Sequence, residues 1–469
     1  MRLPASLLLV LIFTGMASAQ SERYELGLRL RQFEKAWDQT TDPVGRKRAL
    51  AIVKDATNQF FSLKFGEAGK TLDSAKWALR QNNPRTENEI WMASFMMKPD
   101  VRVVDQKVQH ASVMIEQFYK AKPNSIPFQE TKLTFQIQRA NVSELGLPNR
   151  SKTVSVALPT DTFGEFPMEM KLAMGKEAQP LSTITLSRIM DLTERLNSLK
   201  SSFPQFSGSL SKSIEAYHDA IRELKDGIPP ETDFPVSAML AHAELMVKEK
   251  KLIVAAQIPG QEMTSSWFTM ALENKQLAPI RLGVPARRNQ DQALPVVFAL
   301  HGAGGSENMF FDSYGDGQVV RECSRRGWLL VAPRSPGFVA SPPVKEILEQ
   351  LRSFQKIDDT KVFILGHSMG AGQTIDLCQK HPTLFAGAAV MGGGGRIRDA
   401  KSFATLPTFI GIGDKDFAFA GAKSLRQSLE KGGATKLRYK EYPDLEHLVI
   451  VREALPDAFA MFDEIFMNK

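Results

Sequence analysis

The strongest constraint on the fold is a change of pattern after about residue 279, where short continuous apolar runs begin to alternate with helix-compatible stretches. The runs are residues 280–284, 296–300, 328–332, 362–365, 387–391, 409–412 and 437–442. Continuous apolar runs are typical of parallel strands buried on both faces, whereas a strand with one solvated face alternates. Strands that alternate with helices predict an α/β domain over residues 276–469, with a parallel sheet and flanking helices.

The run at 362–365 leads directly into Gly-His-Ser-Met-Gly at residues 366–370, and a helix-compatible segment follows. Glycines on both sides are what a sharp, strained turn between a strand and a closely packed helix requires. Such a turn would expose the hydroxyl of Ser368 at the carboxyl edge of the sheet, where open α/β folds build their sites. The sequence therefore predicts that Ser368 is a nucleophile.

A second glycine-rich segment, His-Gly-Ala-Gly-Gly at residues 301–305, follows the run at 296–300. Small side chains there allow backbone amides to face a ligand. We expect the amide of Met369, with that of Ala303 or Gly304, to form an oxyanion hole for a tetrahedral intermediate. Neither segment has a dinucleotide or P-loop pattern, and no Cys or His pair has zinc spacing, so we expect no cofactor and no metal.

With residues 279–285, these two segments make the chain from about residue 279 to 469 resemble the α/β-hydrolase superfamily. Within it, they are similar to secreted esterases of the polyhydroxybutyrate-depolymerase and feruloyl-esterase type, and to prolyl-oligopeptidase-like hydrolases. The resemblance implies the order Ser, acid, His along the chain. It implies His447 as the base and Asp416 as the acid, with Asp414 as the competing carboxylate.

The expected activity is that of a serine hydrolase that cleaves a carboxylic ester through an acyl-enzyme on Ser368. His447 would accept the hydroxyl proton, while Asp416 would fix the imidazole tautomer. The expected substrate is a small-molecule or polysaccharide-linked ester, with access controlled by residues 333–343. Two alternatives stay open: a prolyl-oligopeptidase-like serine peptidase, because the same groups cleave amides, and a catalytically silent protein that binds a glycan or a partner.

The first part of the chain shows other periods. Apolar residues at helical spacing predict helices over residues 26–37, 46–62, 182–200, 210–224 and 234–250. Strict alternation predicts antiparallel strands with one polar face at 133–138, 154–158 and 168–172. We therefore expect an α+β N-terminal region, divided into a helical segment at 20–99, a β-rich module at 100–178, and a helical segment with a linker at 179–275.

Residues 1–19 have the layout of a secretory signal peptide, with Arg2, an apolar stretch at 7–13, and Ala-Ser-Ala at 17–19 before Gln20. We expect cleavage before Gln20 and a secreted or periplasmic protein. The apolar stretch is shorter than the roughly 20 residues of a spanning helix, so we expect no integral membrane segment.

Composition narrows the possible partners and cross-links. The formal net charge of +7 is spread along the chain and forms no concentrated basic tract with interleaved aromatic residues, so we expect no nucleic-acid partner. Cys323 and Cys378 are the only cysteines, so stability must come from the core and not from a disulfide framework. Whether these two cysteines pair stays open at this point.

Overall fold

A computed structural model of the chain describes residues 5–467 except 123–130, 138–139, 147–150, 175–176, 258–259, 274, 287–291 and 338–339. By the density of its internal contacts the chain divides into two compact units. The N-terminal unit comprises Met1–Ser202 and Tyr217–Glu244, and the C-terminal unit comprises Phe203–Ala216 and Leu245–Lys469. We describe each unit by itself.

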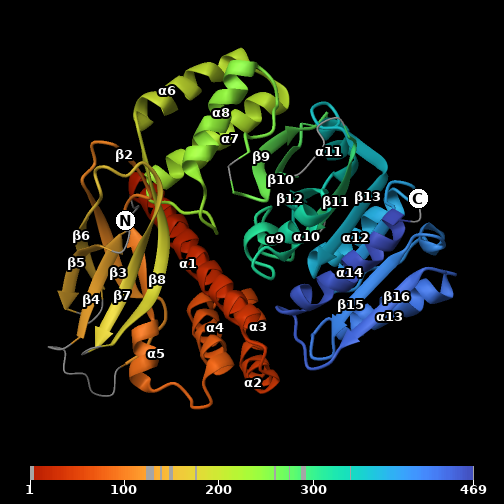
Figure 1. The fold of residues 1–469 in the computed structure, drawn as a ribbon, viewed down its shortest axis with the longest axis horizontal. Coiled ribbons are helices and arrows are strands. Elements are labelled where there is room, and N and C mark those ends of the chain that lie inside the picture. The colour runs from red at the N-terminus through yellow and green to blue at the C-terminus, as the bar shows by residue number, and fades with distance from the viewer. Residues whose placement is uncertain are drawn as a thin grey trace. The chain divides into compact units, whose positions relative to one another are not determined.

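The described residues of the C-terminal unit form an eight-stranded sheet with the order β16-β15-β14-β13-β11-β12-β10-β9 (Figure 1). The strands are β9 (Met263–Ala271), β10 (Leu277–Pro285), β11 (Leu294–Leu300), β12 (Leu329–Pro333), β13 (Ile357–His367), β14 (Gly387–Met391), β15 (Thr408–Gly413) and β16 (Leu437–Tyr442). From β12 to β16 neighbouring strands run parallel, whereas β10 is antiparallel to both β9 and β12. The predicted α/β sheet is confirmed, but the sheet is mixed and not wholly parallel, because the strand predicted at 280–284, which is β10, runs antiparallel to both of its neighbours.

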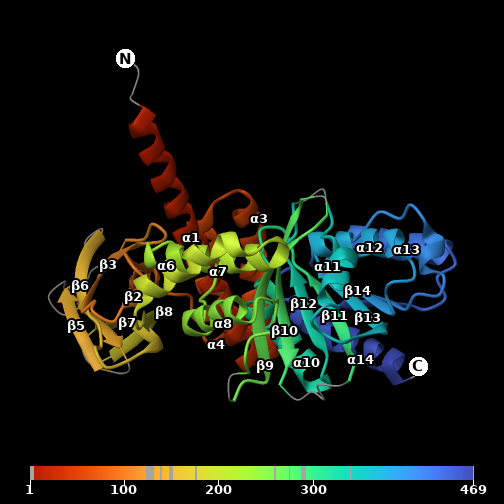
Figure 2. The ribbon, with the colours of Figure 1, turned by 90° about the horizontal axis from the view of Figure 1, so that it is seen from above.

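Helices cover both faces of this sheet. They are α9 (Met309–Asp312), α10 (Gln318–Arg326), α11 (Val344–Leu351), α12 (Met369–Lys380), α13 (Phe419–Lys431), α14 (Ile450–Met467) and the short 3-10 helix at Ala400–Phe403. Figure 2 shows α12 on one side of the central strands, and α10 and α14 on the other. Strands β11, β12, β14 and β15 are buried along their whole length, which is why their sequences are continuously apolar.

The core on the α10 and α14 side is aromatic. The ring of Trp328 stacks on that of Phe363, with centroids 5.2 Å apart, and Phe363 stacks on Phe462 of α14 at 4.6 Å. All three side chains are almost fully buried. Full burial of one such side chain is worth about 1.5–3 kcal/mol, so this layer fixes α14 on the strands that carry the site.

The N-terminal unit combines helices with β-structure, as predicted, although the β-structure forms two sheets and not one small antiparallel module. Its helices are α1 (Ala5–Gln39), α2 (Pro43–Val53), α3 (Ala56–Phe61), α4 (Phe65–Arg80), α5 (Glu87–Ala93) and α6 (Leu192–Ser202). The unit boundary falls within α7 (Gly208–Lys225) and α8 (Val236–Glu249), and a 3-10 turn at Phe203–Gln205 precedes α7. The helices predicted over 210–224 and 234–250 are thus present as α7 and α8.

The described strands of this unit form a three-stranded sheet, β1-β3-β6, and a five-stranded sheet, β2-β8-β7-β4-β5. They are β1 (Phe95–Pro99), β2 (Val103–Asp105), β3 (His110–Gln117), β4 (Thr131–Ile137), β5 (Ala140–Gly146), β6 (Ser151–Ala157), β7 (Gly164–Met174) and β8 (Glu177–Ile189). Except for β2 with β8, the paired strands are antiparallel. Alternating burial along β3 and β6 matches the expected polar face.

Three secondary-structure predictions were wrong in detail. The helix predicted over 182–200 begins only at Leu192, because Ser182, Ile184 and Leu186 alternate as buried residues of β8. The helix predicted over 46–62 is divided into α2 and α3. Strand β9 lies in the stretch predicted to be a linker, although it pairs with β10 along nine residues.

Helix α1 includes residues 5–19 of the stretch predicted to be a signal peptide, and residues 1–4 lie outside the described residues. Of residues 5–19 the structure describes the backbone alone. None of the helices among the described residues contains a stretch that is long and apolar enough to cross a membrane.

We predict that Cys323 and Cys378 remain unpaired thiols. Both are free and buried, and burial raises the pKa of each thiol above its usual value. They lie on α10 and α12, on opposite sides of the sheet, whereas a disulfide needs Cα atoms about 4.4–6.8 Å apart. A thiol reagent should therefore not label the folded protein and should titrate two thiols in denaturant without reductant. Titration of no thiol after unfolding would contradict this prediction.

Candidate active site

Ser368 lies at the turn between β13 and α12, in a backbone conformation that residues other than glycine rarely adopt. Its backbone angles are φ 55° and ψ −115°. A Cβ atom on Gly370 would lie 2.0 Å from the carbonyl oxygen of Leu300, and one on Gly366 would lie 2.2 Å from the carbonyl oxygen of Gly370. Both neighbours must therefore be glycine for β13, β11 and α12 to pack this closely. The turn has the geometry of a nucleophile elbow.

Ser368, His447 and Asp416 form one hydrogen-bonded series. Nε2 of His447 lies 2.9 Å from Oγ of Ser368, and Nδ1 lies 2.9 and 3.0 Å from the two carboxylate oxygens of Asp416. Because a carboxylate accepts, Nδ1 donates to Asp416, which leaves Nε2 to accept the Ser368 proton. The His447 and Asp416 side chains are buried. The residues come from three distant segments that follow β13, β15 and β16.

Of the two candidate acids, the structure brings Asp416 to His447. The backbone N–H of Ala418 donates to Oδ1 of Asp416 at 2.8 Å, which fixes the orientation of this carboxylate. Asp414 instead forms an ion pair with Lys415 at 3.5 Å.

The 301–305 loop, which carries two of the predicted oxyanion-hole amides, passes beside the nucleophile. A Cβ atom on Gly302 would lie 3.4 Å from Cβ of Ser368, so the loop backbone directly borders the elbow. Gly304 has a φ of 79°, which an L-residue rarely adopts. Met369 is the first residue of α12, where amides have no acceptor within the helix. The choice between Ala303 and Gly304 stays a prediction.

His301 connects this loop to Ser335. Nδ1 of His301 donates to the carbonyl oxygen of Gly302 at 2.7 Å, and Nε2 accepts from the backbone N–H of Ser335 at 3.0 Å. Burial lowers the pKa of His301, which favours the neutral ring that both bonds require. Arg334 and Glu307 add a bidentate pair with distances of 2.6 and 2.7 Å. These contacts connect the predicted access segment to the 301–305 loop.

Sequence reasoning missed two residues that touch or adjoin the base. The ring of Phe417 lies 4.2 Å from that of His447 between centroids, yet 64% of Phe417 is exposed. Glu446 is buried beside His447 and accepts from the amides of Leu448 and Val449 at 3.0 and 3.2 Å. Neither has a motif of its own, although both adjoin predicted site residues in the sequence.

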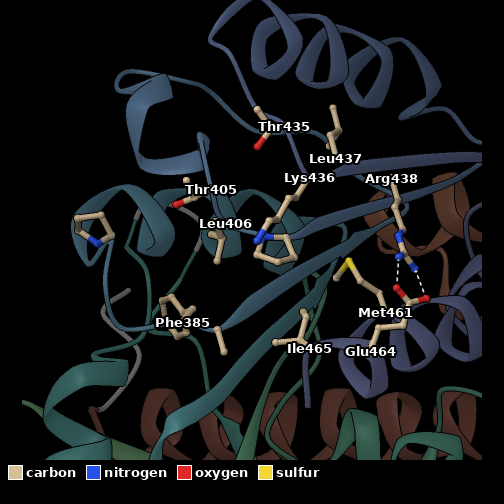
Figure 3. Close-up of a pocket in the computed structure, with 13 residues that line it drawn as sticks. Phe385, Thr405, Leu406, Thr435, Lys436, Leu437, Arg438, Met461, Glu464 and Ile465 are labelled. Carbon is tan, nitrogen blue, oxygen red and sulfur yellow. Dashed lines mark hydrogen bonds and ion pairs between the residues drawn. The ribbon is translucent and has the colours of Figure 1, made fainter. Parts of the chain in front are cut away.

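The cavity in Figure 3 lies at the amino ends of the parallel strands, opposite the end that carries Ser368. Its volume is about 680 Å³, and its lining includes Ala386, Pro407 and Lys436, which directly precede β14, β15 and β16. Ser368, Asp416 and His447 instead follow the carboxyl ends of β13, β15 and β16, which run parallel to β14, so the cavity is separate from the candidate active site. Arg438 and Glu464 form an ion pair across one side of it.

Among the described residues, no group of three or more His, Cys, Asp or Glu side chains is arranged to hold a metal ion. A hydrogen-bonded Ser, His and Asp series of this kind can support acyl transfer, since the imidazole can move a proton to and from the serine oxygen while the carboxylate orients it.

Comparison with known proteins agrees with the fold. Residues 295–449 match the family described as the alpha/beta hydrolase fold, so the C-terminal part of the chain is an α/β-hydrolase domain. No curated protein sequence matches the chain significantly.

Several solved structures are similar to parts of the chain. The structure of a thermostable esterase is 16% identical in sequence, with a TM-score of 0.38, and the match covers 80% of this chain and 99% of the esterase chain. A ferulic acid esterase of the anaerobic fungus Anaeromyces mucronatus is 17% identical, with a TM-score of 0.37, covering 44% of this chain and 92% of its own. An S-formylglutathione hydrolase from Agrobacterium tumefaciens is 16% identical in sequence, with a TM-score of 0.37, and the match covers 45% of this chain and 99% of the hydrolase chain.

Glu446 makes stability depend on pH. Burial, with a further contribution from the negative charge of Asp416, raises the pKa of Glu446 from 4.5 to about 7. The folded state therefore holds a proton that the unfolded chain releases, and this stabilisation is present below pH 4.5 and is lost as the pH rises through about 7. We predict that Glu446→Gln, which keeps an acceptor oxygen without the charge, gains stability relative to the parent protein as the pH increases.

Relative to the parent, the free energy of unfolding of Glu446→Gln should increase by roughly 3 kcal/mol from about pH 4.5 to about pH 8. Urea unfolding of both proteins across that range measures it. Glu349→Gln on the exposed surface of α11 is the matched control, and its difference from the parent should not follow the same curve. A stability difference for Glu446→Gln that is the same at both ends of the range would contradict the prediction.

Proposed function

We propose that the C-terminal unit is a serine hydrolase that cleaves carboxylic esters through an acyl-enzyme on Ser368. The observation that carries the proposal is the 2.9 Å contact between Oγ of Ser368 and Nε2 of His447, whose other nitrogen is held by buried Asp416. The strained backbone of Ser368 adds support, because such strain persists where the surrounding structure imposes it and is concentrated at functional sites.

In the acylation step, Nε2 of His447 takes the proton of Ser368 as Oγ attacks the ester carbonyl carbon. Asp416 stays ionised and stabilises the imidazolium through Nδ1. The tetrahedral oxyanion accepts hydrogen bonds from the amide of Met369 and from that of Ala303 or Gly304. When the carbon–oxygen bond to the alcohol breaks, the proton on Nε2 passes to the departing alkoxide, which leaves as the alcohol.

Deacylation repeats these transfers with water. Nε2 of His447 takes one proton from a water molecule as its oxygen attacks the acyl carbon. Collapse of the second tetrahedral intermediate breaks the bond to Oγ of Ser368, which recovers the proton from His447. The products are the free acid and the original enzyme, so no external reductant or oxidant is needed.

Phe417 indicates which esters to examine first. Because His447 protonates the departing oxygen, the exposed ring of Phe417 beside it offers an apolar surface to the alcohol part of the substrate. Esters of aromatic alcohols are therefore suitable probes, and both small esters and polysaccharide-linked esters belong in the substrate panel.

We predict that Ser368→Ala lowers kcat for aryl esters by on the order of 10⁶-fold, because the nucleophile is lost and the remaining groups act only as a unit with it. Ester turnover and covalent labelling by a fluorophosphonate probe measure the effect. Ser353→Ala, which changes an exposed serine of the same unit, should keep both.

Two outcomes would contradict the proposal. If the parent protein cleaves blocked peptides but not esters, the peptidase alternative replaces ester hydrolysis. If it cleaves neither and Ser368 takes up no probe, the unit has no serine-hydrolase activity, and a binding role gains support.

We further propose that the protein is exported and cleaved between Ala19 and Gln20, as the pattern of residues 1–19 indicates. Expression with a secretory pathway should yield a protein whose N-terminal residue is Gln20, which sequencing of the purified chain measures. Ala17→Arg, which replaces a small residue that the signal peptidase must accommodate, should block cleavage. An exported protein that retains Met1 would contradict the prediction.

A further inference from the structure

A series of buried hydrogen bonds connects the 301–305 loop, the elbow and the base without including a predicted triad side chain. The backbone N–H of Gly302 lies 3.2 Å from the hydroxyl oxygen of Tyr314. That hydroxyl lies 2.8 Å from Nδ1 of His367, and Nε2 of His367 lies 3.1 Å from the carbonyl oxygen of His447. Tyr314 and His367 are both buried.

The two ends of the series determine where its protons lie. A carbonyl oxygen only accepts, so Nε2 of His367 donates to His447. A backbone N–H only donates, so the hydroxyl oxygen of Tyr314 accepts from Gly302 and gives its own proton to Nδ1 of His367. This arrangement requires a neutral His367 ring, and burial, together with the nearby His447, holds the pKa of His367 well below its usual value.

Close packing leaves His367 little freedom. Its ring centroid lies 4.9 Å from that of Tyr314 in an edge-on arrangement, and 4.6 Å from that of His447. A Cβ atom on Gly302 would lie 3.1 Å from Nδ1 of His367, and one on Gly392 would lie 3.0 Å from Nε2. Two glycines therefore enclose the ring on both sides, and the ring has little room to shift toward the backbone of Gly302 or of Gly392.

We propose that Tyr314 and His367 are positioning residues for the reaction of Ser368, because they hold the backbones of Gly302 and His447 at a fixed separation. The inference rests on the proposed function. Through Gly302 the pair sets the 301–305 loop, and through the His447 carbonyl it sets the imidazole that must face Ser368. Neither side chain transfers a proton to the substrate, so each acts through the groups that do.

The test uses the full-length protein with three single variants. Tyr314→Phe removes one hydroxyl and keeps the ring. His367→Leu removes both ring nitrogens, and His367→Gln retains an amide N–H that can donate to the His447 carbonyl. Tyr442→Phe is the matched control, since Tyr442 is another buried tyrosine of the same unit, and its hydroxyl donates to Asp457 on α14.

Two measurements separate positioning from a purely structural role. The first is kcat and KM for an aryl ester, and Tyr314→Phe should lower kcat by about tenfold with KM nearly unchanged, since the series touches no substrate. His367→Leu should lower kcat more than His367→Gln does. The double variant Tyr314→Phe/His367→Leu should be no slower than His367→Leu alone, because both changes break the same series. Tyr442→Phe should keep the parent kcat.

The second measurement is the set of ring nitrogen resonances in protein labelled at histidine with nitrogen-15. In the parent protein His367 should show the neutral form protonated at Nε2, and Tyr314→Phe should shift the resonances of His447. This readout needs no turnover, so it judges the positioning role even if the parent protein cleaves no ester, a result that would refute the proposed function alone. If His367→Leu does not fold, Tyr314→Phe and His367→Gln still decide.

The proposal is overturned if Tyr314→Phe keeps both the parent kcat and the parent His447 resonances. Additive losses in the double variant would also overturn it, as would an equal fall in kcat in Tyr442→Phe, which would make the effect a general one of removing a buried hydroxyl.

Discussion

The site depends on one backbone constraint, the left-handed conformation that the chain adopts at Ser368. A residue held at φ 55° in this way costs about 1–3 kcal/mol, and nothing in the serine side chain favours it. The surrounding packing imposes it. The Ser368 amide donates to the carbonyl oxygen of Met391 at 3.1 Å, while Gly366 and Gly370 allow β13 and α12 to approach closer than any side chain would permit. The burial of this sheet and of the helices on it compensates for the strain.

Once the elbow is fixed, the sheet brings the other groups to it. Strands β13, β14, β15 and β16 are parallel neighbours, so the segments that follow them meet at one edge. Neighbouring strands lie about 4.8 Å apart, so β13 and β15, which have β14 between them, are about twice that distance apart, and Ser368 and Asp416 are too far apart to touch. The His447 ring spans that gap, with one nitrogen toward each partner. Its orientation therefore decides whether the three groups act together, and both its side chain and its backbone carbonyl are hydrogen-bonded.

The sequence predicted those parts of this arrangement that leave a local pattern. Continuous apolar runs indicated β10 to β15, and glycines around Ser368 indicated the elbow, because burial on both faces and close backbone contact each restrict residue type. Strand β8 was missed, since its alternating apolar residues fit a helix as well as a strand over a short stretch, and strand β9 was missed because it lies in the stretch predicted to be a linker. Tyr314 left no signal at all. Its role comes from a contact with His367, 53 residues away, and no spacing in the sequence reports such a contact.

The buried groups around His447 respond differently to pH, and their hydrogen-bond partners explain why. His367 lies between a hydroxyl that donates to it and a carbonyl that accepts from it, so its neutral form satisfies both partners and protonation would break the bond to Tyr314. Glu446 accepts from two backbone amides, which favour its ionised form, while burial opposes that form, and these influences leave its pKa near neutrality, at about 7. A positioning residue must keep one protonation state, as His367 does, since a protonation that broke one hydrogen bond would move His447. His367, whose pKa lies well below its usual value, directly precedes Ser368 at the elbow, whereas Glu446, whose pKa is about 7, lies on the loop that leads into α14.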